Sequence, residues 1–316
     1  MRPLFQPILM HFAARYAGHT YGEFASDYRV LVKSNLKCME DFQIDAVGLI
    51  SDPYRETAAF GAEISYPDEG VPRCRKPIVE KMEDIHALKN PDIYKAGRTL
   101  DRIKAGEQLS RETGGRVPVI GWVEGPLAES CSLAGVNEVL LKIFMEPDFV
   151  KRLMEKTLVT AKDFARAQVE AGCGIIGVGD AICSQISADN YREFVRELHE
   201  DLFTYIQSLG ARVKLHICGN ISHLLGDLRD LRPDILDLDW MVDMDHAYHV
   251  LGPDMIRCGN LDPVSVIQDQ NPEAIAAATR ALCMKEQGRA FILSGGCEVT
   301  VNTPVSHLKA MKEGTI

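Results

Sequence analysis

The sequence predicts an α/β fold of the (β/α)8 TIM-barrel class, arranged as a single domain. Short apolar runs typical of strands alternate with longer helical stretches along most of the chain, and this alternation indicates a parallel sheet. Polar side chains also gather where the strands end. In a barrel these ends share one face, on which such enzymes place their active sites. A doubly wound sheet usually carries a glycine-rich phosphate turn after its first strand, whereas residues 51–53 here read Ser-Asp-Pro.

The expected barrel spans residues 46–312 and follows an N-terminal extension at residues 1–45. Residues 54–77 are rich in glycine and proline, so we expect an excursion or a hairpin beside the barrel there. Seven strands are expected, and the eighth is ambiguous. The seven are assigned to residues 46–50, 117–125 (a strand and its loop), 175–178, 213–220 (a strand that ends in a turn), 234–240, 255–260 and 290–294.

The expected helices follow from apolar periodicity and from their end signals. In the helix at residues 148–170 the apolar side chains share one face, and Gly172 lies just past its end. Ser187 is expected to cap the next helix, and Asn271 to cap a later one. The full set comprises residues 22–42, 94–113, 137–145, 148–170, 188–209, 222–231 and 272–287, with a last helix opened by Thr303-Pro304.

Composition excludes several classes of protein. The chain has 316 residues, 46% of them hydrophobic and 25% charged, as expected for a globular domain with a sizeable core. A formal net charge of -10 argues against a protein whose main task is binding nucleic acid. No apolar run approaches the ~20 residues of a membrane span, and residues 1–18 make a poor signal peptide. Nine cysteines without a small-domain framework suggest free thiols, so we expect a cytoplasmic protein with no nucleic-acid or membrane partner.

Three residues suggest a metal site at the barrel mouth. Strand side chains alternate between faces, so His216 and Cys218 point the same way from the end of their strand. Cys297 follows another strand and a pair of glycines. One nitrogen and two sulfurs suit Zn²⁺ with an open fourth position, in which a thiol or a substrate oxygen could be activated. Glu298 could be a fourth ligand displaced by substrate, or a carboxylate that lies outside the ligand set.

Several carboxylates follow the strands directly. Asp52 and Asp180 each come after an apolar strand, where a charge is costly unless it is bonded or functional. Each could orient substrate or act as a general acid or base, or could hold a loop through backbone N–H groups. Glu124 also lies at a strand end and could help to place the substrate. Asp239 could support His216 at the metal, although a structural role is the simpler interpretation.

Five short runs carry a family resemblance. They are GWVEGPLAE (121–129), GVGDA (177–181), HICGN (216–220), GNLDP (259–263) and GCE (296–298). Together they resemble the uroporphyrinogen decarboxylase superfamily, and the chain is most similar to its cobamide-dependent methyltransferase branch. The resemblance covers about residues 45–312. It implies a (β/α)8 barrel, zinc bound by His216, Cys218 and Cys297, and methyl transfer to or from the cobalt of a corrinoid (cobalamin) carried on a separate corrinoid-binding protein.

The methyltransferase branch performs two kinds of transfer. Some members methylate a thiol such as coenzyme M, and others demethylate a methoxylated aromatic or similar small molecule and load the corrinoid protein. Residues 121–129 and the Asp180 loop resemble the second group. The expected activity is therefore that of a zinc-dependent O-demethylase, in which zinc binds the ether oxygen while cobalt(I) attacks the methyl carbon. Asp180 or Glu124 would place the substrate, and the barrel mouth should have a broad, partly apolar rim.

Two further alternatives stay open. Uroporphyrinogen decarboxylases carry an arginine-rich N-terminal segment and a histidine after the last strand, where this chain has only Arg15 and Cys297. Asp52 does match their central aspartate, but a net charge of -10 suits an eight-carboxylate substrate poorly. The second alternative is a binding protein that retains the fold without catalysis.

Overall fold

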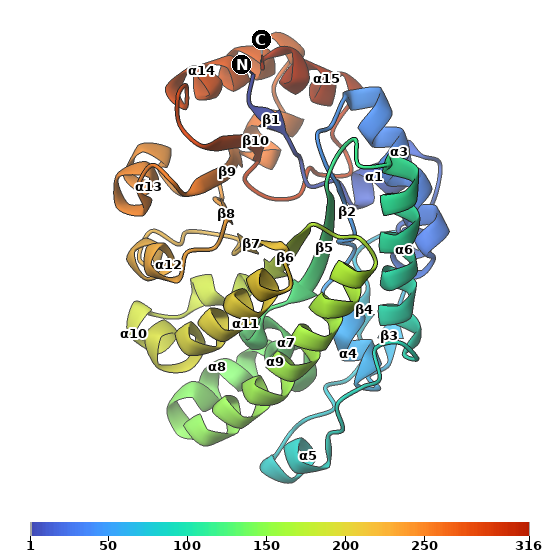
Figure 1. Cartoon of the computed structure of the whole chain (residues 1–316), viewed down its shortest axis with the longest axis vertical. Coiled ribbons are helices and arrows are strands. Elements are labelled where there is room, and N and C mark those ends of the chain that lie inside the picture. Colours follow the sequence, from blue (N-terminus) through green and yellow to red (C-terminus); the bar gives the residue numbers. More distant parts are fainter. Residues whose placement is uncertain (1, 316) are drawn as a thin grey trace.

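Eight parallel strands form a curled sheet in the computed structural model, which describes residues 2–315 (Figure 1). All seven neighbouring pairs are parallel, which confirms the predicted (β/α)8 class. In spatial order the strands are β1 (Leu4–Phe5), β10 (Phe291–Gly295), β9 (Ile256–Leu261), β8 (Ile235–Asp237), β7 (Arg212–His216), β6 (Ile175–Gly179), β5 (Val119–Glu124) and β2 (Val47–Gly48).

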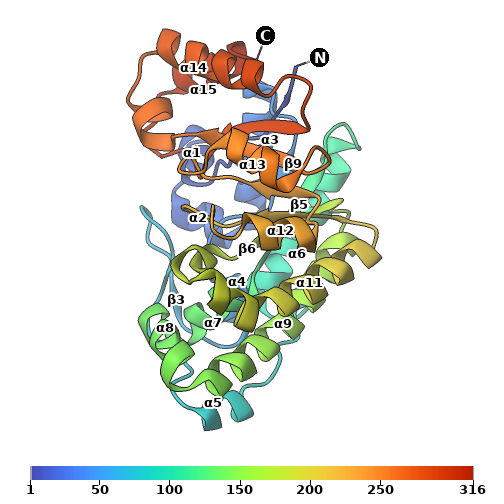
Figure 2. The same ribbon diagram turned by 90° about the vertical axis from the view of Figure 1, so that its left-hand side faces the viewer.

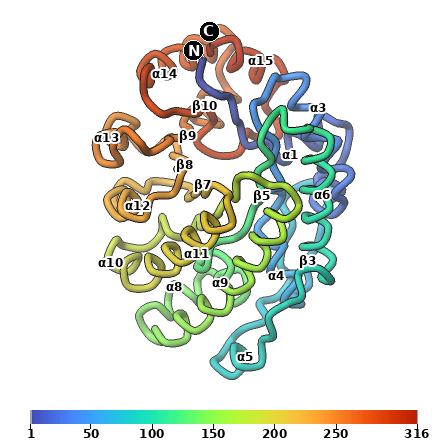
Figure 3. Tube along the Cα trace, in the orientation of Figure 1, coloured from blue at the N-terminus to red at the C-terminus, as the bar shows by residue number. Residues whose placement is uncertain are grey.

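The eighth strand, which the sequence left ambiguous, is Leu4–Phe5. It lies within residues 1–45, so part of the segment expected to precede the barrel belongs to its sheet. β1 pairs with β10, and at its other side the backbone N–H of Asp45 donates to the Phe5 carbonyl over 2.9 Å. The Asp45 carboxylate in turn accepts from the Phe5 N–H at 2.7 Å. These two bonds bring the two ends of the sheet together. The first and last described parts of the chain lie close to each other at the top of the trace (Figure 3).

Helices surround the sheet, as the alternation of elements predicts. The expected helix at residues 22–42 is interrupted at Asp27, whose extended backbone ends one helix and whose carboxylate caps the next. The helices are α1 (His11–Tyr16), α2 (Tyr21–Ser26), α3 (Tyr28–Phe42), α4 (Arg55–Ala59), α5 (Met82–Ala87), α6 (Gly97–Thr113), α7 (Pro126–Ala134), α8 (Val136–Met145), α9 (Pro147–Glu170), α10 (Ala188–Asn190), α11 (Arg196–Ser208), α12 (Leu225–Leu231), α13 (Met244–Leu251), α14 (Pro272–Lys285) and α15 (Val305–Glu313).

Local signals in the sequence are confirmed at several ends. The Ser187 side chain accepts from the Asn190 N–H, and the Asn271 side chain accepts from the Ala274 N–H. A π-helical turn at Tyr191–Val195 joins α10 to α11 within the stretch expected as one helix. Two further short helical turns lie at Ala181–Gln185 and Pro263–Gln268. No described helix is long and apolar enough to cross a membrane.

The segment at residues 54–77 forms both a helix and a hairpin. α4 follows β2, and strands β3 (Ile64–Ser65) and β4 (Arg73–Cys74) then pair antiparallel, as the glycine and proline content predicts. The hairpin, α7 and α8 lie together at the lower left of the side view (Figure 2). This segment therefore stands beside the sheet, and its helix α4 packs against α6 and α7.

The barrel interior changes from apolar to polar along the strands. A cluster separate from the main core fills one level; its members are Ala46, Ile120, Ile175, Ile235, Cys258 and Ile292. Two residues further along β5, β6 and β8, the inward positions hold Trp122, Gly177 and Asp237. The apolar level therefore lies directly below the polar groups of the barrel mouth.

Gly177 leaves the space that the Trp122 ring occupies. A Cβ atom at Gly177 would lie 2.2 Å from Cε3 of Trp122, and Trp122 is buried. We predict that Gly177→Ala lowers the free energy of unfolding by about 1–3 kcal/mol, because the buried ring has to move. Urea unfolding measures the change. Gly226→Ala on α12 is the control, since its Cβ would meet nothing within 4 Å. Equal stability of both variants would contradict this packing.

Candidate metal centre

His216, Cys218 and Cys297 meet at the mouth of the barrel. His216 is the last residue of β7, Cys218 follows two residues later, and Cys297 follows β10 at the same interval. The His216 Nε2 atom lies 2.9 Å from the Cys218 sulfur and 3.9 Å from the Cys297 sulfur. The two sulfurs are 3.4 Å apart. The structure thus brings together the three residues that the sequence singled out as ligands.

The three donor atoms match the size of a zinc site. Zn–S and Zn–N bonds of about 2.3 and 2.0 Å place neighbouring ligand atoms of a tetrahedron roughly 3.5–3.8 Å apart. The three separations, from 2.9 to 3.9 Å, reach that size with small shifts of the side chains. Both cysteines are partly exposed, so a fourth position can open toward the mouth. The donor set and its spacing fit Zn²⁺.

The electrostatics of the three groups favour a thiolate. A hydrogen bond from Cys218 and the neighbouring His216 ring lower the pKa of Cys297 to about 4, against the opposing effect of burial. Burial would lower the pKa of His216, but hydrogen bonds to Asp237 and Cys297 raise it to about 10. The bond to Cys297 raises the pKa of Cys218. Because zinc binds thiolates and neutral imidazole, metal binding must release protons from this cluster.

Asp237, rather than Asp239, supports the histidine. The Asp237 Oδ2 atom lies 2.9 Å from His216 Nδ1. Asp239 accepts from the backbone N–H of Gly219 at 2.7 Å, which is the structural role given above as the simpler interpretation. In the expected strand at residues 234–240, Asp237 and Asp239 are two positions apart, so both side chains would point into the barrel. The strand ends at Asp237, and that boundary was not readable from the sequence.

Glu298 points away from the three donors. Its Oε1 atom accepts from the backbone N–H of His11 at 2.9 Å, at the start of α1. Among the described residues, the group whose donor atoms lie within 4.8 Å of one another contains His216, Cys218 and Cys297 without Glu298. Burial raises the pKa of Glu298 to about 7. In the structure this carboxylate lies outside the cluster of three donor atoms and ties α1 to the Cys297 loop.

Asp180 lies at the end of β6 and is fully buried. Its two oxygens accept from the backbone N–H groups of Ala128 and Leu127 in the first turn of α7, at 2.8 and 3.3 Å. His199 Nε2 lies 3.0 Å from the same carboxylate, and its Nδ1 is 2.9 Å from the Tyr191 hydroxyl. This arrangement matches the loop-holding interpretation of Asp180.

A second group of possible ligands contains Asp180, Cys183 and His199. All three are fully buried, and burial raises the pKa of the Cys183 thiol. Since the carboxylate and both ring nitrogens of His199 already have partners, this group serves as a structural hydrogen-bond network. It fixes α7 against the barrel.

Asp52 is held by an arginine from α6. Its Oδ2 atom accepts from Arg98 at 2.6 Å and from the Ser51 hydroxyl at 2.6 Å, and its Oδ1 accepts from the Tyr54 N–H at 3.0 Å. Burial would raise the pKa of Asp52, but Arg98 and Arg55 hold it below its usual value. The carboxylate is therefore ionised and tied to the loop that follows β2.

Glu124 belongs to a buried group of acids that the sequence reading did not identify. Arg55 donates to Glu124 at 2.6 Å, and the Glu124 N–H donates to Glu56 at 2.9 Å. Glu129 accepts from the Thr57 hydroxyl at 3.0 Å. All four charged side chains are buried, and Arg55 forms ion pairs with Glu56 and Glu124. Burial raises the pKa of Glu124 to about 8 and that of Glu129 well above its usual value, and the group retains protons at neutral pH.

Comparison with known proteins adds the family. A family model described as uroporphyrinogen decarboxylase (URO-D) matches residues 4–314. The chain belongs to the uroporphyrinogen decarboxylase family. This confirms the resemblance inferred from the five short runs, and extends it to β1.

Relatives within the uroporphyrinogen decarboxylase family have two kinds of name. The chain is 28% identical to the methylcobamide:CoM methyltransferase MtbA of Methanosarcina mazei, covering 85% of this chain and 78% of the relative. It is 27% identical to the uroporphyrinogen decarboxylase of Chloroflexus aggregans, covering 90% of this chain and 81% of the relative. A solved methyltransferase from Methanosarcina mazei superposes with a TM-score of 0.90 at 21% identity, covering 99% of this chain and 93% of that one.

Burial of Glu129 gives a pH dependence of stability. The pKa of Glu129 is raised in the folded chain. The stability that this neutral carboxyl group contributes is therefore complete below pH 4.5, the pKa of the group in the unfolded chain, and is lost as the pH rises from there toward the folded pKa. Glu129→Gln keeps an acceptor for Thr57 but cannot ionise. We predict that wild type loses up to about 1.4 kcal/mol of unfolding free energy per pH unit relative to this variant. Urea unfolding between pH 5 and 8 measures the difference, with exposed Glu107→Gln as the control. Parallel curves for wild type and Glu129→Gln would contradict the assignment.

Proposed function

We propose that the chain is a zinc-dependent methyltransferase, which moves a methyl group between a small methylated substrate and the cobalt of a separate corrinoid protein. The observation that carries this proposal is the meeting of His216, Cys218 and Cys297 at the barrel mouth, with donor atoms within 4.8 Å of one another. One imidazole and two thiolates formally cancel the charge of Zn²⁺ and leave a coordination position free. That donor set suits activation of a substrate atom, whereas a closed structural site has four protein ligands.

The relatives support the methyl-transfer part of the proposal. MtbA is named for methylcobamide and coenzyme M in two Methanosarcina species. Bound zinc would supply a Lewis acid that polarises a donor oxygen or lowers the pKa of a thiol. His216, Cys218 and Cys297 would hold it, and Asp237 fixes the ring of His216 through Nδ1.

The walls of the mouth leave room for substrate and partner. Trp122 packs beside His216, with ring centroids 5.9 Å apart, and offers an apolar wall. Trp240 and Met241 are both 48% exposed and follow β8. A Cβ at Gly296 would lie 2.4 Å from the backbone nitrogen of Trp240, so the Trp240 backbone lies directly beside the Cys297 loop. Such a rim suits the docking of a corrinoid domain over the metal.

The methyl group could move in either of two directions, from a small-molecule donor to the corrinoid or from the corrinoid to a thiol. The family runs at residues 121–129 and 177–181 favour a methoxylated aromatic or similar methyl donor, with Glu124 and Asp180 shaping its site. The names of MtbA relatives favour a thiol such as coenzyme M as methyl acceptor. Decarboxylation is less well supported, because Asp52 is buried and paired with Arg98. The clustered thiols at the open mouth of the barrel argue against a binding protein without catalysis.

The test is methyl transfer with free cobalamin in place of the corrinoid protein. We expect zinc-loaded protein to methylate cob(I)alamin from a methoxylated aromatic, or to transfer methyl from methylcobalamin to coenzyme M, as followed by the cobalt absorption spectrum. Cys218→Ala should lower the rate by about 100-fold or more, since even residues that only orient ligands contribute 10–100-fold. Cys283→Ala, in α14 and away from the mouth, should match wild type. Zinc-loaded protein that transfers methyl with neither substrate class would contradict the proposal.

A further inference from the structure

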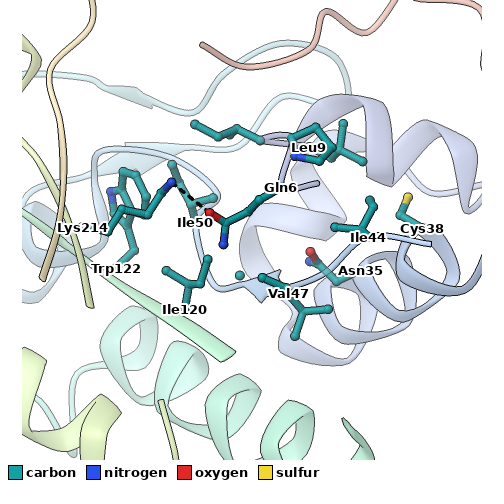
Figure 4. A pocket seen from close by; sticks show the side chains of 14 residues that line it. Gln6, Leu9, Asn35, Cys38, Ile44, Val47, Ile50, Ile120, Trp122 and Lys214 are labelled. Carbon is teal, nitrogen blue, oxygen red and sulfur yellow. Dashed lines mark hydrogen bonds between the residues drawn. The ribbon is translucent and has the colours of Figure 1, made fainter. Parts of the chain in front are cut away.

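A buried chain of polar contacts runs beneath the candidate ligands. Lys214, two residues before His216 on β7, forms an ion pair with Asp237 Oδ1 at 2.5 Å. The other oxygen of Asp237 meets His216 Nδ1 at 2.9 Å. Lys214 also donates to Gln6 Oε1 at 3.1 Å (Figure 4). The chain therefore links the end of β1 to the metal centre through a lysine and a carboxylate.

The position of Lys214 is costly without a specific role. The side chain is 2% exposed and lies inside the barrel, where the level below is entirely apolar. Burying an ammonium group carries a large desolvation cost that an ion pair only partly offsets. An apolar residue of the same length would fill this space at lower cost. Stability alone therefore does not account for a lysine here.

The contacts of Asp237 explain what the lysine does. With one carboxylate oxygen held by Lys214, the other faces His216 and accepts its Nδ1–H. This fixes the tautomer in which Nε2 carries the lone pair, and Nε2 faces Cys218 and Cys297 at 2.9 and 3.9 Å. The Asp237 charge would add a negative charge beside two thiolates. The Lys214 ammonium cancels the charge of Asp237, and the two thiolates cancel the charge of Zn²⁺, so the metal centre as a whole would be formally neutral.

We propose that Lys214 is a positioning residue of the metal centre, which acts through Asp237 to hold His216 in its metal-binding orientation and to balance the charge of the site. The inference rests on the zinc site of the proposed function, and it does not depend on methyl transfer.

A small cavity lies beside the Lys214 side chain. A space of about 50 Å³ adjoins Lys214, Gln6 and Trp122 (Figure 4). Such a space can hold water. Without the ammonium group, water from this cavity can fill the space that Lys214 leaves, and Asp237 loses the ion pair that holds its carboxylate beside His216. Removal of Lys214 is therefore expected to alter the orientation of His216 through Asp237.

The test compares metal affinity in Lys214→Met, Lys214→Arg and Asp237→Asn. Zn²⁺ affinity is measured by competition with a chromophoric chelator, and Co²⁺ is bound in place of zinc to report the ligand geometry by its visible spectrum. We expect Lys214→Met and Asp237→Asn each to weaken zinc binding by about 10–100-fold and to shift the cobalt bands. Lys214→Arg should restore most of the affinity, because it keeps the charge. Lys214→Gln replaces the methionine variant should that variant not fold.

A double variant and a matched control separate positioning from general destabilisation. Because Lys214 acts through Asp237, the double variant Lys214→Met/Asp237→Asn should bind zinc no more weakly than Asp237→Asn alone. Ile292→Ala opens the apolar level of the same barrel, so it should lower stability yet leave zinc affinity and the cobalt spectrum unchanged. Wild-type affinity and spectrum in folded Lys214→Met, or fully additive losses in the double variant, would overturn the inference. Wild type that binds no zinc would overturn both this inference and the proposed function.

Discussion

The curl of the sheet is the constraint on which the candidate site depends. Cys218 and Cys297 are 79 residues apart in the chain, and β8 and β9 separate their strands in the sheet. Only closure toward a barrel brings their sulfurs to 3.4 Å and both within reach of His216. The two residues of β1 contribute to that closure, because they pair with β10 and bond to Asp45 at the opposite end of the sheet.

Around this centre, charged groups are buried in pairs whose partners come from different elements. Lys214 and Asp237 lie on β7 and β8, Arg98 of α6 holds Asp52 after β2, and Arg55 of α4 holds Glu124 at the end of β5. Each pair fixes a segment that borders the mouth. Asp180 does the same with backbone N–H groups, and a Cβ at Gly125 would lie 2.3 Å from its carboxylate, so glycine is required for this approach. The mouth is thus held in shape before any ligand binds, as tight binding of a metal or substrate requires.

The sequence was most informative where one residue type has a strong local signal. The seven strands other than β1 follow from the alternation of elements. The Ser187 and Asn271 caps follow from capping preferences, and the His216, Cys218 and Cys297 set follows from ligand chemistry. β1 was not identified because Leu4 and Phe5 stand between the prolines at positions 3 and 7, whereas β2 lies within the apolar run at residues 46–50. Asp237 could not be separated from Asp239 without knowing where the strand ends. Glu56 and Glu129 lie on α4 and α7, and only the packing of these helices against β5 makes their burial, and hence their raised pKa values, evident.

The most direct measurement is the zinc content and zinc X-ray absorption spectrum of protein purified without chelators, for wild type and Cys297→Ala. We expect about one zinc per chain in wild type, with two sulfur ligands at about 2.3 Å and a nitrogen ligand at about 2.0 Å. Cys297→Ala should lose most of the metal, and Cys283→Ala should retain all of it. Wild type without zinc, or zinc bound with no sulfur ligands, would contradict the assignment of His216, Cys218 and Cys297 as the metal centre and with it the proposed methyl transfer.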